Sequence, residues 1–192
     1  MFADLLWQRL AGVVELSAGQ VEALEAHYQL LLRWNRTLNL TSIKRMEEAV
    51  ERHYCESLFL GTHLPQGHLR IADIGSGAGF PGFPTAVLRP DCSVTLIESH
   101  QRKAVFLREA SRNQPNVRVL ARRAEDVDEQ FDWAISRAVS YADLAPFLKN
   151  LAPSVDLLTG GEEAPEGIGF VWQSPIPVPW GRQRFLRIGR QE

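Results

Sequence analysis

The hydrophobic pattern of the chain changes near residue 65. Before this point, apolar residues recur every three or four positions, a spacing typical of amphipathic helices. After it, short runs rich in Val, Ile and Leu alternate with helical segments, which indicates parallel strands joined by crossover helices. We therefore expect an α/β fold with a mostly parallel sheet, divided into an N-terminal helical region over residues 1–65 and a sheet domain over residues 66–192.

The helical region predicts two helices separated by a turn. Ser17 and Gln20 have the spacing of a capping box, so the first helix should begin after Ser17. Residues 34–42 break the helical periodicity and predict the turn. A second helix is expected from about residue 47 to residue 60.

The sheet domain predicts five strands in sequence order, followed by a less regular C-terminal part. We expect the strands at residues 69–74, 93–98, 117–121, 131–136 and 154–158, and crossover helices at 81–88, 100–112 and 141–151. The polar stretch 160–167 is short where another crossover helix would be expected. Residues 171–172 and 185–188 suit a final antiparallel pair, and the prolines at 175, 177 and 179 exclude a central strand between them.

The most informative segment follows the first predicted strand and reads Asp-Ile-Gly-Ser-Gly-Ala-Gly-Phe-Pro-Gly from Asp73 to Gly82. Glycine allows positive φ and lets a ligand approach the backbone without meeting a Cβ. A turn of this kind at the carboxyl end of the first strand of an open α/β sheet is where a nucleotide-like cofactor binds. The segment therefore predicts a cofactor-binding loop.

Two cofactors compete for this loop. Gly77, Gly79 and Gly82 fit the dinucleotide pattern G-x-G-x-x-G, whose helix N-terminus attracts a pyrophosphate. The longer pattern, in which Asp73 and Gly75 precede these glycines, is similar to the first motif of S-adenosylmethionine-dependent methyltransferases, whose cofactor has no phosphate. Glu98 closes the second strand about 20 residues further on and suits the ribose hydroxyls that both cofactors carry.

Composition narrows the class of protein. Cys55 and Cys92 are far apart, so neither a metal site nor a disulfide framework is expected. No apolar run approaches the ~20 residues that span a bilayer. The N-terminus carries Asp4 in place of the basic segment of a secretory signal. We expect a cytoplasmic protein without membrane contact.

The net charge of −2 conceals a segregated distribution of charge. Residues 102–123 hold seven Lys and Arg residues against one acidic residue. A single arginine of this kind usually lies on a solvated helix face, but the clustering favours a face that binds the phosphates of a nucleic acid. The candidates for RNA contact are Lys103, Arg108, Arg122 and Arg123. We expect charge reversal at the last two to weaken RNA binding and to leave cofactor affinity nearly intact.

Six short motifs, taken in order, resemble one known family. They are Trp34-Asn35 with Asn39-Leu-Thr, Arg52-His53 with Glu56-Ser57, the glycine loop, Lys103 with Phe106-Leu-Arg108, Arg123-Ala-Glu125 and Ser136-Arg137-Ala138. Together they resemble the bacterial ribosomal RNA small subunit methyltransferase G family, also called glucose-inhibited division protein B, over roughly residues 20–140. After residue 158 the chain departs from the family pattern, because Thr159 and Gly160 stand where a Lys-Gly pair is usual.

The resemblance implies a Rossmann-like class I methyltransferase that moves a methyl group from S-adenosylmethionine to N7 of a guanine in 16S ribosomal RNA, free or in the small ribosomal subunit. By position it implies cofactor contacts at Gly75, Phe80, Ala124, Glu125 and Arg137; the residues of the loop argument, Asp73, Gly77, Gly79 and Glu98, join them. Arg52, His53 and Arg137 are the substrate-side candidates. A monomer without a metal is expected.

Simpler interpretations stay open at this point. Arg52 and His53 can be an exposed pair on a helix, and Arg137 can be an ion-pair partner of Glu125 or Asp132. Guanine N7 has a free lone pair and carries no proton, so no residue is expected to act as a general base. The rival functions are a methyltransferase with a non-RNA substrate, a ribosome-associated module that binds the cofactor without turnover, and a nicotinamide-dependent oxidoreductase.

Overall fold

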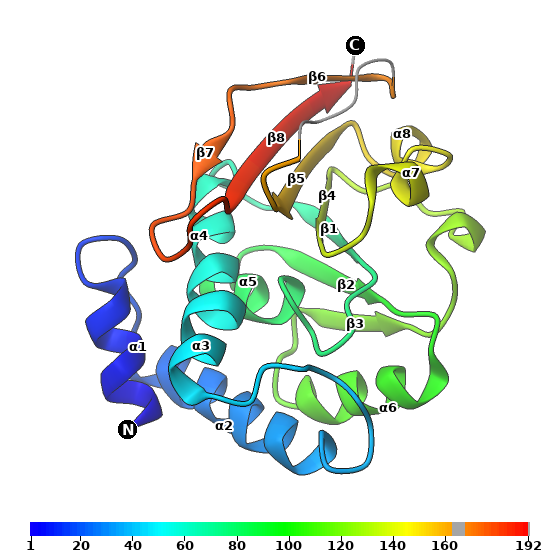
Figure 1. The fold of residues 1–192 in the computed structure, drawn as a ribbon. Coiled ribbons are helices and arrows are strands. Elements are labelled where there is room, and N and C mark those ends of the chain that lie inside the picture. The colour runs from blue at the N-terminus through cyan, green and yellow to red at the C-terminus, as the bar shows by residue number, and fades with distance from the viewer. Residues whose placement is uncertain (163–167, 192) are drawn as a thin grey trace.

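The computed structural model describes residues 1–162 and 168–191, and Figure 1 shows a twisted central sheet with helices on both sides. Most of the polar stretch expected at 160–167 lies outside the described residues. Within the described residues, no helix combines the length and the apolar character that crossing a membrane would require.

The sheet confirms the predicted α/β class. Its strand order is β3-β2-β1-β4-β5-β8-β6, with β7 paired to β8; the first five strands are parallel and β8 is antiparallel to β5. The strands are β1 (Arg70–Ile74), β2 (Ser93–Ile97), β3 (Val117–Leu120), β4 (Trp133–Arg137), β5 (Ser154–Thr159), β6 (Phe170–Trp172), β7 (Ile176–Pro177) and β8 (Phe185–Gln191). The five predicted parallel strands are present within two residues at each end.

The C-terminal strands form the expected antiparallel pair, with β8 inserted between β5 and β6. Every residue of β5 is buried, so this strand needs partners on both of its edges, and β8 supplies the second edge. β7 contains Pro177, which has no N–H to donate, and accordingly it is a two-residue strand that pairs only with β8.

The predicted helices are present, α1 adds a third helix to the two expected in the helical region, and two of the predicted helices differ in detail. They are α1 (Phe2–Leu10), α2 (Ala18–Trp34), α3 (Met46–Ala49), a π-helical segment (Val50–Cys55), α4 (Glu56–His63), α5 (Gly82–Leu88), α6 (Gln101–Ala110), a 3₁₀ turn (Ala124–Asp126), α7 (Tyr141–Leu144) and α8 (Leu148–Leu151). The capping box is confirmed, because Gln20 N–H donates to Ser17 Oγ at 3.3 Å and Ser17 N–H donates to Gln20 Oε1 at 2.8 Å.

The two differences are local. The predicted helix at 47–60 runs from 46 to 63 and contains one wider π-helical turn, which the apolar periodicity did not reveal. The predicted helix at 141–151 is broken into two single turns, α7 and α8, with Pro146 between them.

Two hydrophobic cores sandwich the sheet. The larger one joins α1, α2, α4, α5 and α6 to the face that carries Ile71, Leu96 and Ile135. The smaller one packs α7 and α8 on the opposite face, around Ile74 and Val155. In Figure 1, accordingly, α7 and α8 lie on the other side of the sheet from α4, α5 and α6. The N-terminal helical region thus shares one core with the sheet.

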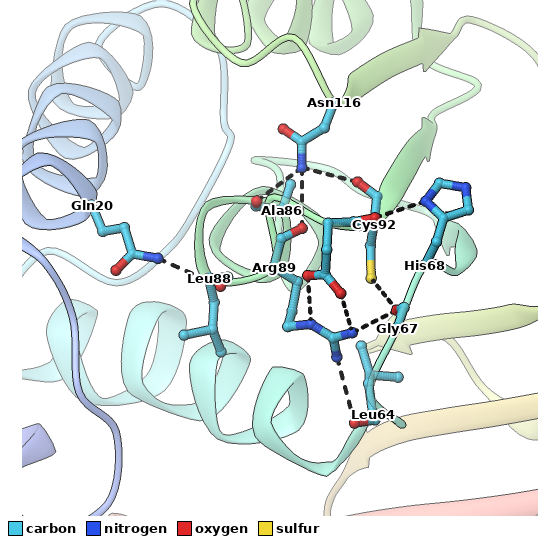
Figure 2. A network of polar contacts seen from close by, with 10 residues as sticks. Gln20, Leu64, Gly67, His68, Ala86, Leu88, Arg89, Cys92 and Asn116 are labelled. Atoms are coloured by element: carbon cyan, nitrogen blue, oxygen red, sulfur yellow. Dashed lines mark hydrogen bonds and ion pairs between the residues drawn. The ribbon is translucent and has the colours of Figure 1, made fainter.

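A polar network fixes the turn between α5 and β2, at the amino ends of the parallel strands (Figure 2). The side-chain amide of Asn116 donates to the carbonyl oxygens of Ala86, Arg89 and Cys92 at 3.0, 3.3 and 3.1 Å. Carbonyls at the end of a helix have no partner within the helix. Asn116 satisfies some of those at the end of α5, and the side chain of Gln20 donates to the carbonyl oxygens of Val87 and Leu88 at 2.9 and 3.5 Å. The network lies at the opposite end of α5 from the glycine loop and holds the crossover in place.

We predict that Asn116→Ala lowers the free energy of unfolding by about 1–3 kcal/mol, because it leaves buried carbonyl oxygens without a donor. Urea unfolding followed by circular dichroism measures this. Asn113→Ala, at an exposed position in the same turn, is the matched control and should change stability by less than about 0.5 kcal/mol. Equal effects of the two substitutions would contradict the capping role of Asn116.

Candidate functional site

The glycine loop lies at the carboxyl end of β1, where the strand order reverses between β1 and β4. Ligands of open α/β sheets bind at this reversal point. Gly75, Gly77 and Gly79 have φ of +67°, +56° and +92°, so the expected left-handed turn is confirmed. Their surroundings differ: a Cβ on Gly75 would meet Val139 Cγ2 at 3.0 Å, whereas a Cβ on Gly79 would meet the buried ring of His27 at 3.2 Å.

Asp73 is the buried anchor of the loop. Its Oδ2 accepts the backbone N–H of Gly82 at 3.0 Å, and a Cβ on Gly82 would lie only 2.5 Å from that oxygen. Its Oδ1 is buried and has no partner among residues 1–162 and 168–191. Burial raises the pKa of the Asp73 carboxyl to about 7. The loop therefore encloses a fully buried carboxyl oxygen that has no donor among the described residues.

Glu98 follows β2 and ties the second strand to the loop. Its Oε2 accepts the N–H of Gly77 at 2.8 Å, and its Oε1 accepts the N–H of His100 at 2.8 Å. Each carboxylate oxygen has two acceptor sites, so each retains one for a ligand hydroxyl. The position suits the ribose contact that the sequence predicts, and that contact stays a prediction.

The first cavity beside the loop has a volume of about 200 Å³, and we call it the loop cavity. It contains three predicted cofactor residues, Gly75, Ala124 and Glu125. Its other lining residues are Ile74, Ile97, Ser99, Arg122, Arg123, Val139, Asp143 and Phe147. The residues after β4 and in α7 escaped the sequence analysis, because they come close to the loop only through the parallel pairing of β4 with β1.

Arg122 and Arg123 lie beside the glycine loop. Both line the loop cavity together with Gly75, and Arg123 donates to Glu125 at 3.2 Å. Their RNA contact, and the expected independence of cofactor binding from their charge, stay predictions, although a charge change here alters the wall of the loop cavity. Lys103 and Arg108 lie on α6 outside both cavities described here, and their RNA contact stays a prediction.

A second cavity of about 300 Å³ brings together the substrate-side candidates Arg52, His53 and Arg137, and we call it the arginine cavity. Its remaining lining residues are Leu40, Thr41, Ser42, Ile43, Ala138 and Arg184. Ala138 lines the arginine cavity and its neighbour Val139 lines the loop cavity, so the two cavities adjoin across this segment. Ala138 has φ of +62°, a conformation that is uncommon for a residue with a Cβ and is enriched at functional sites.

His53 is buried, so the interpretation of Arg52 and His53 as an exposed pair is wrong for His53. The His53 ring stacks on Phe80 at a centroid distance of 4.5 Å, and its Nε2 lies 2.8 Å from Thr41 Oγ1. Burial, assisted by the charge of Arg137, lowers the pKa of His53 to about 2, so the ring is neutral. Both residues lie on the π-helical segment, a feature that often marks functional sites.

Arg137 lines the arginine cavity and contacts both Arg52 and Phe80. Its Nη1 donates to the carbonyl oxygen of Arg52, and its guanidinium lies 5.2 Å from the centroid of the Phe80 ring. Among the described residues it forms no ion pair with Glu125 or Asp132, so that interpretation is wrong. Burial lowers the pKa of Arg137 to about 10, which leaves it charged at neutral pH.

Phe80 does not line the loop cavity, although the resemblance implies a cofactor contact for it. It is buried among the rings of His53, Tyr54 and His27 and below the Arg137 guanidinium. The glycine loop therefore places this ring under the arginine cavity, where it supports the two substrate-side residues.

His27 is a residue that the sequence analysis missed. Its Nε2 lies 3.0 Å from the carbonyl oxygen of Ala78 and must donate there, so its Nδ1 accepts the hydroxyl of Tyr54 at 2.8 Å. Burial lowers the pKa of His27 to about 3, which keeps the ring neutral. The contact links α2 and the π-helical segment to the middle of the glycine loop. Its neighbour Tyr28 fitted the apolar ridge of the helix, and no local pattern distinguished His27.

Next to the glycine loop, Asp73 Oδ1 and the remaining lone pairs of Glu98 are acceptors, and the wall of the loop cavity carries Glu125 and Asp143 as well as Arg122 and Arg123. The carboxylates suit a ligand with an ammonium group and ribose hydroxyls. S-adenosylmethionine meets this requirement. The sheet order and the glycine loop, with carboxylates beside it, are those of a Rossmann-like S-adenosylmethionine-dependent methyltransferase, which matches the second of the two cofactor patterns seen in the sequence.

Comparison with known families identifies the particular group. The profile of the family described as rRNA small subunit methyltransferase G, GidB, matches residues 20–156, and the chain belongs to this family. The proteins of that name from Chromobacterium violaceum and Halorhodospira halophila are each 42% identical, over 71% and 76% of this chain. The alignments span 66% and 71% of those relatives, so the chain spans about two thirds of their length.

Solved structures agree on the fold. An S-adenosylmethionine-dependent methyltransferase from Aquifex aeolicus superposes with a TM-score of 0.59 at 17% identity, over 76% of this chain and 93% of that one. The 1,6-didemethyltoxoflavin-N1-methyltransferase from Burkholderia thailandensis, solved with S-adenosylhomocysteine, gives 0.55 at 17% identity over 93% and 92%. The resemblance to the methyltransferase fold is confirmed.

We predict that His27 makes the folded protein sensitive to acid. An unfolded histidine binds a proton below pH ~6.5, whereas folded His27 stays neutral down to about pH 3. The unfolded chain therefore binds more protons in this range, so stability falls as the pH falls through about 6.5. His27→Gln keeps an amide donor for Ala78 and removes the titration.

Between about pH 7.5 and pH 5.5, the wild type should lose about 1.4 kcal/mol more unfolding free energy than His27→Gln. Urea unfolding at both pH values gives this difference. The other titrating groups of the site, Asp73 and His53, are common to both proteins and cancel in the comparison. Parallel pH dependences of the two proteins would show that His27 is not held neutral.

Proposed function

We propose that this protein transfers a methyl group from S-adenosylmethionine to N7 of a guanine in 16S ribosomal RNA. The observation that carries the proposal is the pair of adjoining cavities at the carboxyl edge of the sheet. The loop cavity presents Gly75 and the carboxylates of Glu125 and Asp143 to a nucleoside with an ammonium group. The arginine cavity presents Arg52, Arg137 and Arg184, which suit an anionic substrate such as RNA. Membership of the methyltransferase G family supports the identity of the substrate.

The chemistry requires little from any single side chain. Bound S-adenosylmethionine supplies an electrophilic methyl group on a positively charged sulfur. Guanine N7 attacks with its own lone pair and has no proton to lose, so the site needs no general base. This agrees with His53, which is buried and neutral; its Nε2 is hydrogen-bonded to Thr41, and its buried Nδ1 has no partner among the described residues. The contribution of the chain is alignment of the two reactants.

The arrangement of the arginine cavity suits a base that has left its helix. N7 lies in the major groove, which is too deep and narrow in A-form RNA for side chains to enter. The target guanine must therefore be in an irregular element or be turned out of its stack. Arg137, held between the Arg52 carbonyl and the Phe80 ring, is fixed in position to meet such a nucleotide at the boundary of the loop cavity. We place this reaction in the cytoplasm, with the protein acting as a monomer.

Transfer of labelled methyl from S-adenosylmethionine to small ribosomal subunits and to free 16S RNA from cells lacking the protein tests the proposal. We expect one new 7-methylguanine, detected by mass spectrometry of the digested RNA, and its absence from RNA of the untreated deletion strain. Cofactor binding without transfer to either substrate would favour the module without turnover. Transfer to a protein or a small molecule alone would favour a non-RNA methyltransferase.

We predict that Gly75→Ala weakens S-adenosylmethionine binding by at least about tenfold in Kd. A methyl group here would lie 3.0 Å from Val139 in the wall of the loop cavity, at a φ that disfavours alanine. Calorimetric titration measures the affinity. Gly12→Ala is the matched control, because Gly12 also has positive φ, +75°, and a Cβ there meets no described atom within 4 Å. It should share the backbone cost of roughly 1–2 kcal/mol and keep full affinity; equal affinities of both variants would contradict the placement of the cofactor.

A further inference from the structure

Arg184 reaches the arginine cavity from a distant part of the chain. It lies in the turn before β8, beyond residues 20–156 that match the family profile. Figure 1 shows this turn, in red, beside α4. The turn is held to the N-terminal region by Trp180, whose indole N–H donates to the carbonyl oxygen of Arg9 at 3.0 Å. Arg184 therefore reaches the arginine cavity from a turn that is hydrogen-bonded to α1 through Trp180.

Arg184 is oriented by a buried carboxylate. Its Nε donates to Glu56 Oε1 at 3.1 Å and its Nη2 donates to Glu56 Oε2 at 2.6 Å, which is the bidentate geometry that fixes a guanidinium plane. Glu56 is fully buried, at the start of α4, directly after the π-helical segment. The side chain of Arg184 keeps 22% of its surface exposed, on the cavity side.

The pairing leaves donors free to bind a ligand. A guanidinium has five N–H groups, and Glu56 accepts from the Nε and from one of the two hydrogens on Nη2. Three N–H groups of Arg184 remain. Because the side chain is already immobilised by Glu56, a ligand that accepts from these groups loses little conformational entropy in ordering it.

The charges around the arginine cavity favour an anion. Arg52, Arg137 and Arg184 line it, and Glu56 lies beneath them as the ion-pair partner of Arg184. Arg52 is additionally paired with Glu48, at 3.0 Å on the exposed surface. An RNA chain offers phosphate oxygens, which planar guanidinium groups recognise in bidentate fashion.

We propose that Arg184 binds a backbone phosphate of the RNA next to the target guanosine, with Glu56 as the residue that positions it. The inference rests on the proposed function and names a substrate contact in a segment outside the family match. Arg184 then fixes the register of the RNA, and Arg137 faces the nucleotide that enters toward the loop cavity.

The test measures how the affinity for a 16S RNA fragment depends on salt concentration. This dependence reports the number of phosphate contacts and does not require methyl transfer. Removing one contact to single-stranded RNA lowers the slope of log K against log salt by ~0.7. Arg184→Ala leaves Glu56 buried and unpaired, so the variant of choice is the double substitution Glu56→Gln with Arg184→Gln, in which two amides replace the ion pair. We expect its slope to fall by ~0.7 and its RNA affinity to fall by about tenfold, with S-adenosylmethionine affinity unchanged.

Two further variants separate binding from folding. Arg184→Lys keeps a charge beside Glu56, so it should retain the wild-type salt slope while losing part of the affinity, since it cannot pair bidentately. Arg182→Ala removes an exposed arginine two residues earlier, which forms no ion pair among the described residues, and should match the wild type.

An unchanged slope in the double variant would overturn the inference and leave Arg184 as a structural partner of Glu56. A parallel loss of cofactor affinity would also overturn it, because the two cavities would then not be separate sites. The methyl-transfer assay on the same RNA distinguishes this from failure of the proposed function. If the wild type transfers the methyl group and the double variant keeps the wild-type salt slope, only the Arg184 contact is refuted. If the wild type binds RNA through Arg184 but transfers no methyl group, only the proposed reaction is refuted.

Discussion

The hydrogen bond from the Gly77 N–H to the Glu98 carboxylate, at 2.8 Å, is the contact on which the site depends. Gly75, Gly77 and Gly79, at alternate positions, have positive φ and lie in neither a helix nor a strand. The backbone groups of the loop therefore need hydrogen-bond partners from elsewhere. Glu98 supplies one from β2, and His27 supplies another at Ala78 from α2. Asp73 supplies a third at Gly82. The loop is therefore a fixed structure before any ligand arrives.

The same contacts join the two halves of the site. Tyr54 donates to His27, which donates to the loop, and Tyr54 is the neighbour of His53 on the π-helical segment. His53 stacks on Phe80, a loop residue, and Phe80 supports Arg137. A displacement of the loop is therefore transmitted to the arginine cavity through packed rings and two hydrogen bonds. The N-terminal helices are part of the methyltransferase site because they carry this connection.

Much of the fold could be predicted because its signals are local. Each parallel strand is a short apolar run, and the capping box at Ser17 is readable from two residues. The helix at 46–63 shows the limit: its apolar periodicity predicts a helix, but a π-helical turn shifts the register by a single residue, and that shift depends on what the side chains pack against. The exposed-pair interpretation of Arg52 and His53 failed for this reason, since His53 is buried against Phe80, a ring 27 residues further along the chain.

The sequence by itself determined the α/β class, the glycine loop, the acidic residues that end β1 and follow β2, and the family, because each depends on neighbours within a few positions or on motifs in a fixed order. Only the tertiary structure decided which arginines share a cavity. Arg122 and Arg123 line the loop cavity, and Arg184 joins both Arg137 and the far more distant Arg52 in the arginine cavity. Charge along a chain records composition, whereas the direction in which a guanidinium points is set by the carboxylates and rings that the fold places beside it.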